Sequence, residues 1–276
     1  MKRTIVYILS TDFAGSHFLS LMLGSNSKAM HLGEVKHLAK PNVRMRWVCY
    51  ICEQKGECEI MKGINAGNID QIYDTIFSRI DPSKTTLIDA SKQITGWADR
   101  FVGRDDYERK YIHLIRDPRA LVRRWAMNSN WKRQLKRRRY VAQRWPLQSL
   151  AGNYDVYSHL WLAENQDITN FIAQHHVPTI LVTYEDLALH TDREVKRLCD
   201  FIGLPYEPAQ LDYWNFQHHG TQKKDYAGKS ERTFDTRWKG FLKPEEVARI
   251  LANEKMNRYL ESQSLRYDEN GITYSR

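Results

Sequence analysis

The segment Tyr111-Ile-His-Leu-Ile-Arg-Asp-Pro-Arg119 contains the clearest structural signal in the chain. Its first five residues are largely apolar and β-branched, which predicts a buried strand. Asp117 can then cap a helix with its carboxylate, and Pro118 suits the first helical position. Arg116 therefore lies at the carboxyl end of a strand and beside a helix N-terminus, where open α/β sheets bind anionic ligands such as phosphate.

A second strand–loop–helix unit lies near residue 1. Thr4–Leu9 predicts a buried strand, Ser10–His17 supplies a loop of small residues, and Ser16–Leu23 predicts a helix. The backbone amides of such a loop can surround a phosphate. Because no Gly-Lys-Ser/Thr follows, the loop is not a Walker A motif, and its phosphate-binding lysine and magnesium-binding hydroxyl are not expected.

Strands and helices alternate along the rest of the chain. Further strands are predicted at 85–89, 111–115 and 179–183, and further helices at 69–80, 118–130, 158–175, 193–202 and 244–262. This order predicts an α/β fold with a central parallel sheet flanked by helices on both faces. Residues 131–157 are expected to form an irregular insertion on the acceptor side, and residues 215–240 a loop that closes over a ligand.

The composition predicts one large domain over residues 1–276. The chain is 42% hydrophobic, which is enough for one substantial core, and four cysteines do not indicate a disulfide scaffold. No apolar run approaches the roughly 18 residues that a membrane span needs. The apolar stretch after Met1 breaks at Ser10-Thr-Asp12 without a small-residue cleavage site, so the sequence predicts a first strand in a cytoplasmic protein.

The net charge of +9 favours an anionic ligand, and much of that charge is local. Six of the nine residues at 131–139 are basic. The segment begins with Trp131, and Tyr140 follows it. A solvated helix face or basic loop explains this as well as a binding surface does. The binding alternatives are an acidic acceptor or an anionic membrane surface. Nucleic acid is not favoured, because no nucleic-acid-binding fold signature accompanies the charge.

Together, the two phosphate-binding segments resemble the sulfotransferases that use 3′-phosphoadenosine 5′-phosphosulfate (PAPS), of the bacterial type and with features of the protein-tyrosine branch. In that family a loop after the first strand holds the 5′-phosphosulfate, and a later strand–Arg-Asp-Pro-Arg–helix segment holds the 3′-phosphate. Ala14–His17 occupies the first motif and Arg116–Arg119 matches the second. Further segments agree in order and spacing: Gly33-Glu34, Asp89–Lys92, Thr183–Leu187, Phe201–Pro205 and Arg237–Lys239.

The resemblance implies a P-loop-NTPase-like three-layer sandwich and transfer of a sulfuryl group from PAPS to a hydroxyl or amine acceptor, with no metal requirement. The residues that it assigns to the nucleotide are Ala14, Gly15, Ser16 and His17 at the 5′ end, Arg116 and Arg124 at the 3′-phosphate, and Lys223 and Lys224 in a late loop. Arg124 stands where the family usually has a serine. The family's product is 3′-phosphoadenosine 5′-phosphate (PAP).

The resemblance also implies the catalytic residues Glu34, Lys92 and His17. Glu34 would accept the acceptor's proton, particularly if a dry pocket raises its pKa, and Lys92 would neutralise the leaving phosphate. An ordinary surface glutamate and a solvated lysine are the structural alternatives. The largest departure is Phe13, which replaces the family's arginine or lysine. His17 or Lys92 can supply the missing charge, or the chain is a poor or inactive enzyme.

Two other functions fit parts of the pattern. A P-loop-like kinase of a small acceptor is disfavoured by the absence of the Walker lysine. A non-catalytic relative that binds a nucleotide or polyanion is favoured by Phe13 and by the basic residues 132–139.

Cys49-x2-Cys52-x5-Cys58 is a separate feature, and His31 and His37 precede it. Three closely spaced thiols with a histidine can bind zinc. The fourth ligand is undefined, however, so free thiols or a redox-sensitive disulfide are favoured over zinc.

Overall fold

The computed structural model describes residues 2–39, 49, 52, 58–127, 130–219 and 234–275. Its centre is a five-stranded sheet in the order β2-β3-β1-β4-β5. The strands are β1 (Thr4–Ser10), β2 (Ala29–Gly33), β3 (Thr86–Lys92), β4 (Glu108–Ile115) and β5 (Thr179–Thr183). Every neighbouring pair is parallel, so all five carboxyl ends lie at one edge of the sheet.

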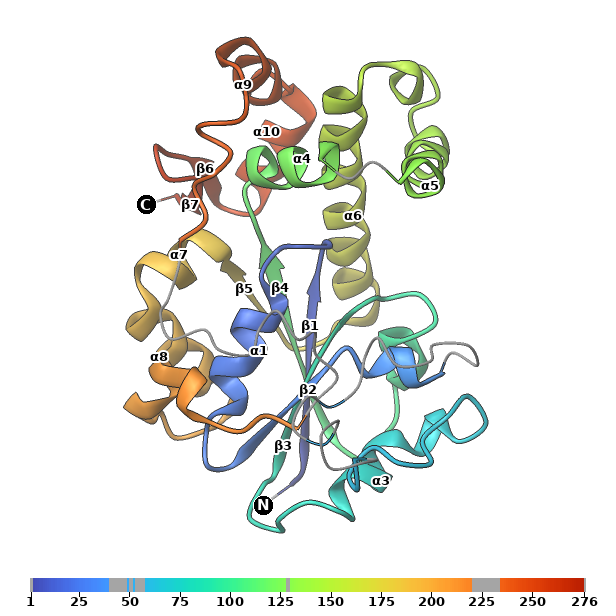
Figure 1. Ribbon diagram of the computed structural model, residues 1–276, viewed down its shortest axis with the longest axis vertical. Coiled ribbons are helices and arrows are strands. Elements are labelled where there is room, and N and C mark those ends of the chain that lie inside the picture. The colour runs from blue at the N-terminus through green and yellow to red at the C-terminus, as the bar shows by residue number, and fades with distance from the viewer. Residues whose placement is uncertain are drawn as a thin grey trace.

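Helices cover both faces of this sheet (Figure 1). Alternate side chains of β1 point to opposite faces, as the two-residue period of a strand requires. Ile5 and Tyr7 pack in a cluster with α3 (Ile72–Phe77) and the C-terminal half of α6 (Asn153–His175). Val6 and Ile8 pack with α1 (Ser16–Gly24) and α8 (Thr191–Ile202). The three-layer sandwich predicted from the sequence is confirmed.

A further group of elements lies beyond the carboxyl ends of the strands, at the top of Figure 1. It contains α4 (Pro118–Ala126), α5 (Trp131–Ala142), α9 (Pro244–Leu251), α10 (Glu254–Ser262) and the antiparallel pair β6 (Leu265–Tyr267) and β7 (Ile272–Tyr274). Together with the N-terminal half of α6 these elements enclose their own apolar cluster, which includes Trp125 and Trp161. This group lies next to the carboxyl edge of the sheet, which is the edge where open α/β sheets generally bind ligands.

Shorter elements connect these parts: η1 (Val35–Ala39), η2 (Ile69–Gln71), η3 (Ala98–Phe101), η4 (Gln148–Leu150), α7 (Tyr184–Leu189) and η5 (Pro208–Asn215). Within the described residues, no helix is both long and apolar enough to cross a membrane.

The expected irregular insertion at 131–157 is wrong, because most of it is helical. Asn130 caps α5 by accepting a hydrogen bond from the Arg133 amide, and Arg137 and Val141 face the interior. The predicted helix at 118–130 ends at Ala126. The predicted helix at 244–262 is divided into two helices, because Asn253 caps a new helix by accepting from the Met256 amide. The strand β2 was not predicted, because it is only five residues long and lacks a clear alternation.

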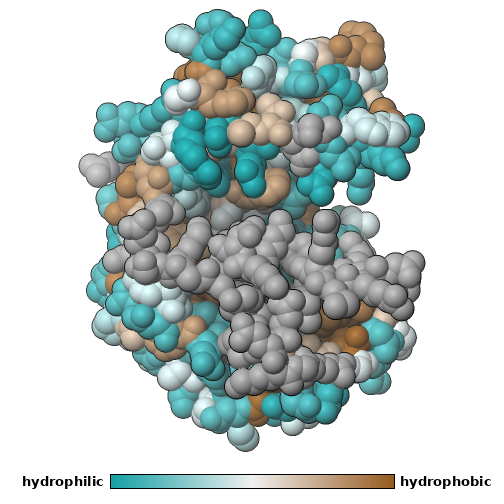
Figure 2. Space-filling model, viewed as in Figure 1, coloured by the Kyte–Doolittle hydropathy of each residue, from teal (hydrophilic) through white to brown (hydrophobic). Residues whose placement is uncertain are grey.

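Exposed basic residues line the outer face of α5. Lys132, Arg133, Lys136 and Arg139 are exposed, and so is Trp131, whose relative exposure is 66%. In the space-filling view, hydrophilic residues predominate in this part of the surface (Figure 2). The basic segment is therefore a helix face open to solvent.

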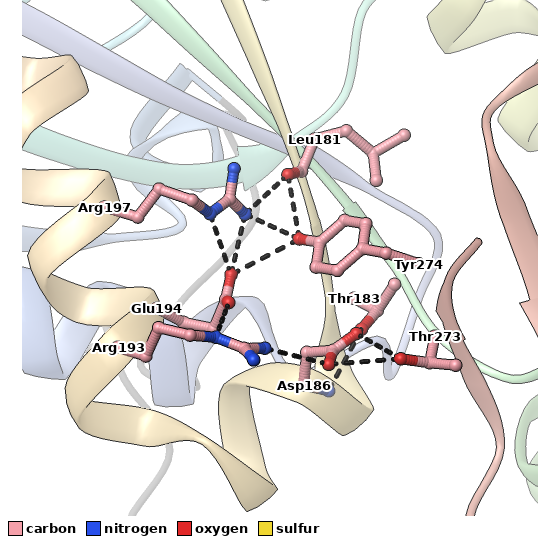
Figure 3. Close-up of polar contacts among 8 residues, drawn as sticks. All are labelled: Leu181, Thr183, Asp186, Arg193, Glu194, Arg197, Thr273 and Tyr274. Atoms are coloured by element: carbon pink, nitrogen blue, oxygen red, sulfur yellow. Dashed lines mark hydrogen bonds and ion pairs between the residues drawn. The ribbon is translucent and has the colours of Figure 1, made fainter. Parts of the chain in front are cut away.

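Polar contacts around Asp186 join α7 and α8 to β7 (Figure 3). Thr183 accepts a hydrogen bond from the Asp186 amide, which caps α7, and donates its own hydroxyl to the Asp186 carboxylate at 2.7 Å. Thr273 of β7 also donates to Asp186. Arg193, Arg197 and Tyr274 converge on the neighbouring Glu194. The Thr183–Leu187 segment therefore has a structural role, in holding the C-terminal hairpin against the sheet.

Candidate functional site

The loop between β1 and α1 forms a turn that can receive an anion. The Ala14 amide donates to the Thr11 carbonyl at 3.4 Å, and Gly15 adopts a left-handed φ of 103°. A Cβ on Gly15 would lie 2.7 Å from the Tyr184 ring, so only glycine fits there. Gly15 offers no side chain to cap α1, and the first turn of the helix contains no acidic residue. The positive end of α1 can therefore bind an anion that reaches this loop.

Arg116 connects this loop to the second motif. Its Nη1 donates to the Phe13 carbonyl at 2.8 Å, and its guanidinium lies 4.1 Å from the centre of the Tyr184 ring. Its Nη2 donates to Asp235 Oδ2, also at 2.8 Å. The predicted cap of α4 by Asp117 is confirmed by a 2.6 Å hydrogen bond from the Arg119 amide. The two segments singled out in the sequence thus meet at the carboxyl edge of the sheet.

Arg116, Arg123 and Arg237 interact with the Asp235 carboxylate, and Arg124 acts on Arg123 through its charge; these four residues form an arginine cluster. Arg237 and Arg116 bond to the carboxylate directly, and these contacts hold the Asp235 pKa well below its usual range. Burial lowers the pKa of Arg123, and the charges of Arg237, Arg124 and Arg116 lower it further. The Nε atoms of Arg116 and Arg123 are buried and have no hydrogen-bond partner among the described residues. The Asp235 carboxylate neutralises only part of the charge of this arginine cluster, and some guanidinium donors have no acceptor among the described residues. A phosphate can supply both the negative charge and the acceptors.

Phe13 occupies the place where a basic residue was expected, yet positive charge lies beside it. The guanidinium of Arg124 stands 4.8 Å from the centre of the Phe13 ring. Phe13 has a φ of 72°, a left-handed conformation that costs a bulky residue about 1–2 kcal/mol. Lys92 also has a positive φ, of 65°. Strained backbone of this kind is concentrated at functional sites because the surrounding structure must hold it in place.

Glu34 lies at the meeting point of several basic side chains. Its Oε1 is 2.7 Å from Lys92 Nζ and 3.9 Å from His17 Nδ1. Its Oε2 is 3.1 Å from His37 Nε2 and 3.7 Å from Lys36 Nζ. These groups come from the ends of β2 and β3, from α1 and from η1. Glu34, Lys92 and His17, chosen from distant parts of the sequence, therefore lie together.

The expectation that a dry pocket raises the pKa of Glu34 is wrong for this arrangement. Burial on its own would raise the pKa. The hydrogen bond with His37 and the charges of Lys92 and Lys36 outweigh it and hold the pKa well below its ordinary value. Glu34 is therefore a carboxylate at neutral pH.

Two glutamates with raised pKa values were given no role from the sequence, the half-buried Glu164 and the buried Glu185. Glu164 on α6 has its pKa raised to about 8, first by burial and then by Asp12, while Arg137 and Lys92 oppose the shift. Its Oε2 is buried without a hydrogen-bond partner among the described residues. Glu185 has its pKa raised to about 8 by burial and by Asp117. Glu164 belongs to no motif, and Glu185 lies within the Thr183–Leu187 segment, where no role was assigned to it.

Several residues proved to be structural or could not be assessed. Arg119 is buried, forms an ion pair with Asp117 at 2.6 Å and donates to the Gly271 carbonyl, so it anchors the β6–β7 hairpin. The buried Trp238 packs 4.2 Å from the Arg119 guanidinium. Lys223 and Lys224, predicted to bind the nucleotide, lie outside the described residues.

Comparison with known proteins is consistent with this geometry. Residues 108–208 match a family model described as "Sulfotransferase family". Among solved structures, the sulfotransferase domain from the curacin biosynthetic pathway is similar, with 21% identity, a TM-score of 0.60, and coverage of 91% of this chain and 96% of that one. The sulfotransferase domain of the Synechococcus PCC 7002 olefin synthase has 16% identity, a TM-score of 0.52, and coverage of 97% and 96%.

No match was found among curated proteins. The two solved structures share the fold of this chain across nearly its whole length. The region matched by the family model runs from β4 through Arg116 and α4 to the start of η5, and thus contains the Arg-Asp-Pro-Arg segment at 116–119. Residues 108–208 are therefore similar to the sulfotransferase family, and the fold of the whole chain is shared with two sulfotransferase domains.

Proposed function

We propose that the protein transfers a sulfuryl group from PAPS to a hydroxyl or amine acceptor. The observation that carries this proposal is the pairing of two anion-binding places, the loop before α1 and the arginine cluster around Asp235. They are joined by the hydrogen bond from Arg116 to Phe13. PAPS has anionic groups at both its 5′ and 3′ ends and therefore needs two such places. A nucleotide with phosphates only at its 5′ end would leave the arginine cluster with the Asp235 carboxylate as its anionic partner.

In the proposed complex the amides of Ala14, Gly15, Ser16 and His17 receive the 5′-phosphosulfate. Arg116 and Arg124 hold the 3′-phosphate, and Arg123 offers a further buried donor. The phosphate replaces the Asp235 carboxylate on Arg116, because both compete for the same guanidinium. Lys223 and Lys224 retain the role in nucleotide binding that the family resemblance implies.

The chemical step requires a proton acceptor and a cation for the leaving group. The acceptor oxygen or nitrogen forms a bond to sulfur while the bond from sulfur to the bridging oxygen breaks, so negative charge develops on the departing phosphate. We assign stabilisation of that charge to Lys92 and acceptance of the proton to Glu34. When Lys92 turns from Glu34 towards the phosphate, Glu34 loses a neighbouring charge and its pKa rises. Formation of the donor complex thus activates the base.

Calorimetric titration with PAP tests the donor site. We expect micromolar binding of PAP, much weaker binding of ADP, and loss of PAP binding in Arg116→Ala. Asp235→Asn should bind PAP several-fold more tightly, because it removes the carboxylate that competes for Arg116 and removes no group that donates to the phosphate. Arg139→Ala, on the exposed face of α5, is the matched control and should bind like the unmodified protein. Absence of PAP binding would contradict the proposal.

Phe13 specifically favours a second candidate function, a relative that binds the nucleotide without transferring sulfate. The same protein incubated with radiolabelled PAPS and a panel of hydroxyl and amine acceptors distinguishes the two. Labelled product supports the enzyme, whereas tight PAP binding without any product supports the non-catalytic function.

A further inference from the structure

Three cysteines that the proposed function does not use lie beside a histidine from a distant part of the chain. One ligand atom from each of Cys49, Cys52, Cys58 and His219 lies within 4.8 Å of all the others. The Nδ1 atom of His219 is 3.6 Å from Cys49 Sγ and 3.4 Å from Cys52 Sγ. His219 follows Cys49 by 170 residues in sequence, so no spacing motif indicated it.

These separations suit a tetrahedral zinc ion. With Zn–S bonds of about 2.3 Å and Zn–N bonds of about 2.0 Å, neighbouring ligand atoms of a tetrahedron are about 3.5–3.8 Å apart. The two sulfur–nitrogen distances from His219 agree with that spacing to within about 0.2 Å. The Cys52 amide donates to the Cys49 carbonyl at 3.0 Å, so the backbones of these two residues also lie close together.

The histidine beside the cysteines is His219, not His31 or His37, which precede the cysteines in the sequence. His31 Nδ1 is 2.6 Å from Ser20 Oγ, and His37 hydrogen-bonds to Glu34, so neither supplies the fourth ligand. A disulfide is a poorer explanation of the group. It would join two of the three sulfurs at about 2.05 Å and would leave a thiol and the histidine without a role. None of the three cysteines forms a disulfide within the described residues.

We propose that Cys49, Cys52, Cys58 and His219 bind a structural zinc ion as three thiolates and one neutral imidazole. Four protein ligands fill the tetrahedron, so no position remains open for substrate or water, and the site is structural rather than catalytic. Binding releases the protons of the thiols. The site is also sheltered, because Cys49 and Cys58 belong to the apolar cluster that contains Met61 and Ile64.

Zinc at this position would cross-link two parts of the chain next to the candidate active site. The cysteines follow η1, which begins directly after Glu34, and His219 follows η5. The neighbouring His218 packs against β2, because its ring centre lies 5.7 Å from that of His31. The unfolded chain lacks the assembled ligands, so zinc would bind to the folded chain and not to the unfolded one. Zinc binding would therefore stabilise this junction.

Metal analysis of the full-length, tag-free protein, purified without chelator from zinc-containing medium, tests the proposal directly. We expect about one zinc ion per chain by elemental mass spectrometry. Replacement by Co²⁺ should produce the visible d–d bands of a tetrahedral site together with a thiolate-to-cobalt charge-transfer band. Both readouts are independent of sulfotransferase activity, so failure of the proposed function would leave this test intact. Protein without zinc that also gives no tetrahedral cobalt spectrum would overturn the proposal.

Single substitutions identify the ligands. Cys52→Ser and His219→Ala should each lose most of the bound zinc and lower the thermal midpoint, whereas Cys199→Ser, which removes a thiol on α8 outside the cluster, should retain it. A strong chelator should lower the midpoint of the unmodified protein and leave that of Cys52→Ser unchanged. If a variant fails to fold, zinc content and the cobalt spectrum of the unmodified protein still decide the outcome. Retention of zinc by both ligand variants, or a disulfide among these cysteines in freshly purified protein, would also overturn it.

Discussion

The contact between Glu34 and Lys92 makes each group a strong influence on the other. They are 2.7 Å apart and both side chains are largely buried, so their interaction is screened less than that of a surface pair. Binding of the donor changes this contact in the proposed mechanism, because Lys92 turns to the leaving phosphate. The residue scale is therefore where the chemistry can be tested most directly.

Lys92→Met should lower kcat by about 10²–10⁴-fold, because it removes the cation that stabilises the leaving phosphate. The pKa of Glu34 should rise at the same time, which moves the acidic limb of the pH–kcat/KM profile to higher pH. Steady-state kinetics across pH measure both effects. Lys196→Met, which removes an exposed lysine paired with Asp192, is the control and should leave kcat and the profile unchanged. Unchanged kcat in Lys92→Met would remove Lys92 from the mechanism.

Glu164 makes stability depend on pH. Its pKa is raised from 4.5 to about 8 in the folded protein, so folding binds a proton between these values. The contribution of Glu164 to the free energy of unfolding is fully present below about pH 4.5. It is lost as the pH rises through about 8. As the pH rises, the free energy of unfolding of Glu164→Gln should therefore increase relative to that of the unmodified protein. The difference between about pH 4 and about pH 9 should be on the order of a few kcal/mol.

Urea unfolding at several pH values measures this difference. Glu261→Gln, on the exposed side of α10, is the control and should show the pH dependence of the unmodified protein. A difference between Glu164→Gln and the unmodified protein that is constant across pH would contradict the raised pKa.

At the scale of the elements, polar contacts hold together parts that the apolar clusters do not join. Asp186 is buried and links the start of α7 to Thr273 of β7 and to Arg193 of α8 (Figure 3). The β6–β7 hairpin is held from its other side by Arg119, through the Gly271 carbonyl. Since the hairpin has only two short strands, it depends on these anchors.

Asp186→Ala should destabilise the protein by about 2–4 kcal/mol, because it removes the acceptor of several buried hydrogen bonds and leaves their donors unpaired. The change in urea midpoint reports this loss. Asp192→Ala, two residues before Glu194 and exposed, should have little effect. Equal effects of the two substitutions would show that the contacts around Asp186 do not hold the hairpin.

At the scale of the whole molecule, two groups of basic side chains among the described residues lie apart from each other. The arginine cluster around Asp235 lies at the carboxyl edge of the sheet, whereas the exposed arginines and lysines of α5 lie on the helical part of the molecule beyond it (Figure 1). We propose that the first binds the donor and the second attracts an acidic acceptor. An anionic membrane surface is the alternative for α5.

Replacing Lys132, Arg133, Lys136 and Arg139 together by glutamine removes four charges from the net charge of +9. PAP affinity should change by less than about two-fold, because it depends on short-range contacts in the other cluster. With an acidic acceptor, kcat/KM should fall and should lose most of its dependence on salt. Kinetics at low and high ionic strength test this, with a neutral acceptor as control. Equal losses with both acceptors would show that α5 does not select for charge.

The amino-acid sequence alone determined the layered architecture and the two segments that meet at the edge of the sheet. Apolar runs such as Thr4–Leu9 and the cap of α4 by Asp117 are local signals, and they identify strands and helix starts without knowledge of the fold. The extent of the single domain over residues 1–276 stays a prediction.

Only the tertiary structure decided how the side chains meet. Glu164 and Asp235 belong to no motif, and His219 reaches the cysteines from 170 residues away. The low pKa of Glu34 also depends on Lys92, from the end of β3, in addition to Lys36 and His37 beside it in sequence. Electrostatic interactions and metal coordination act over a few ångströms in space regardless of separation in sequence, so local patterns cannot report them.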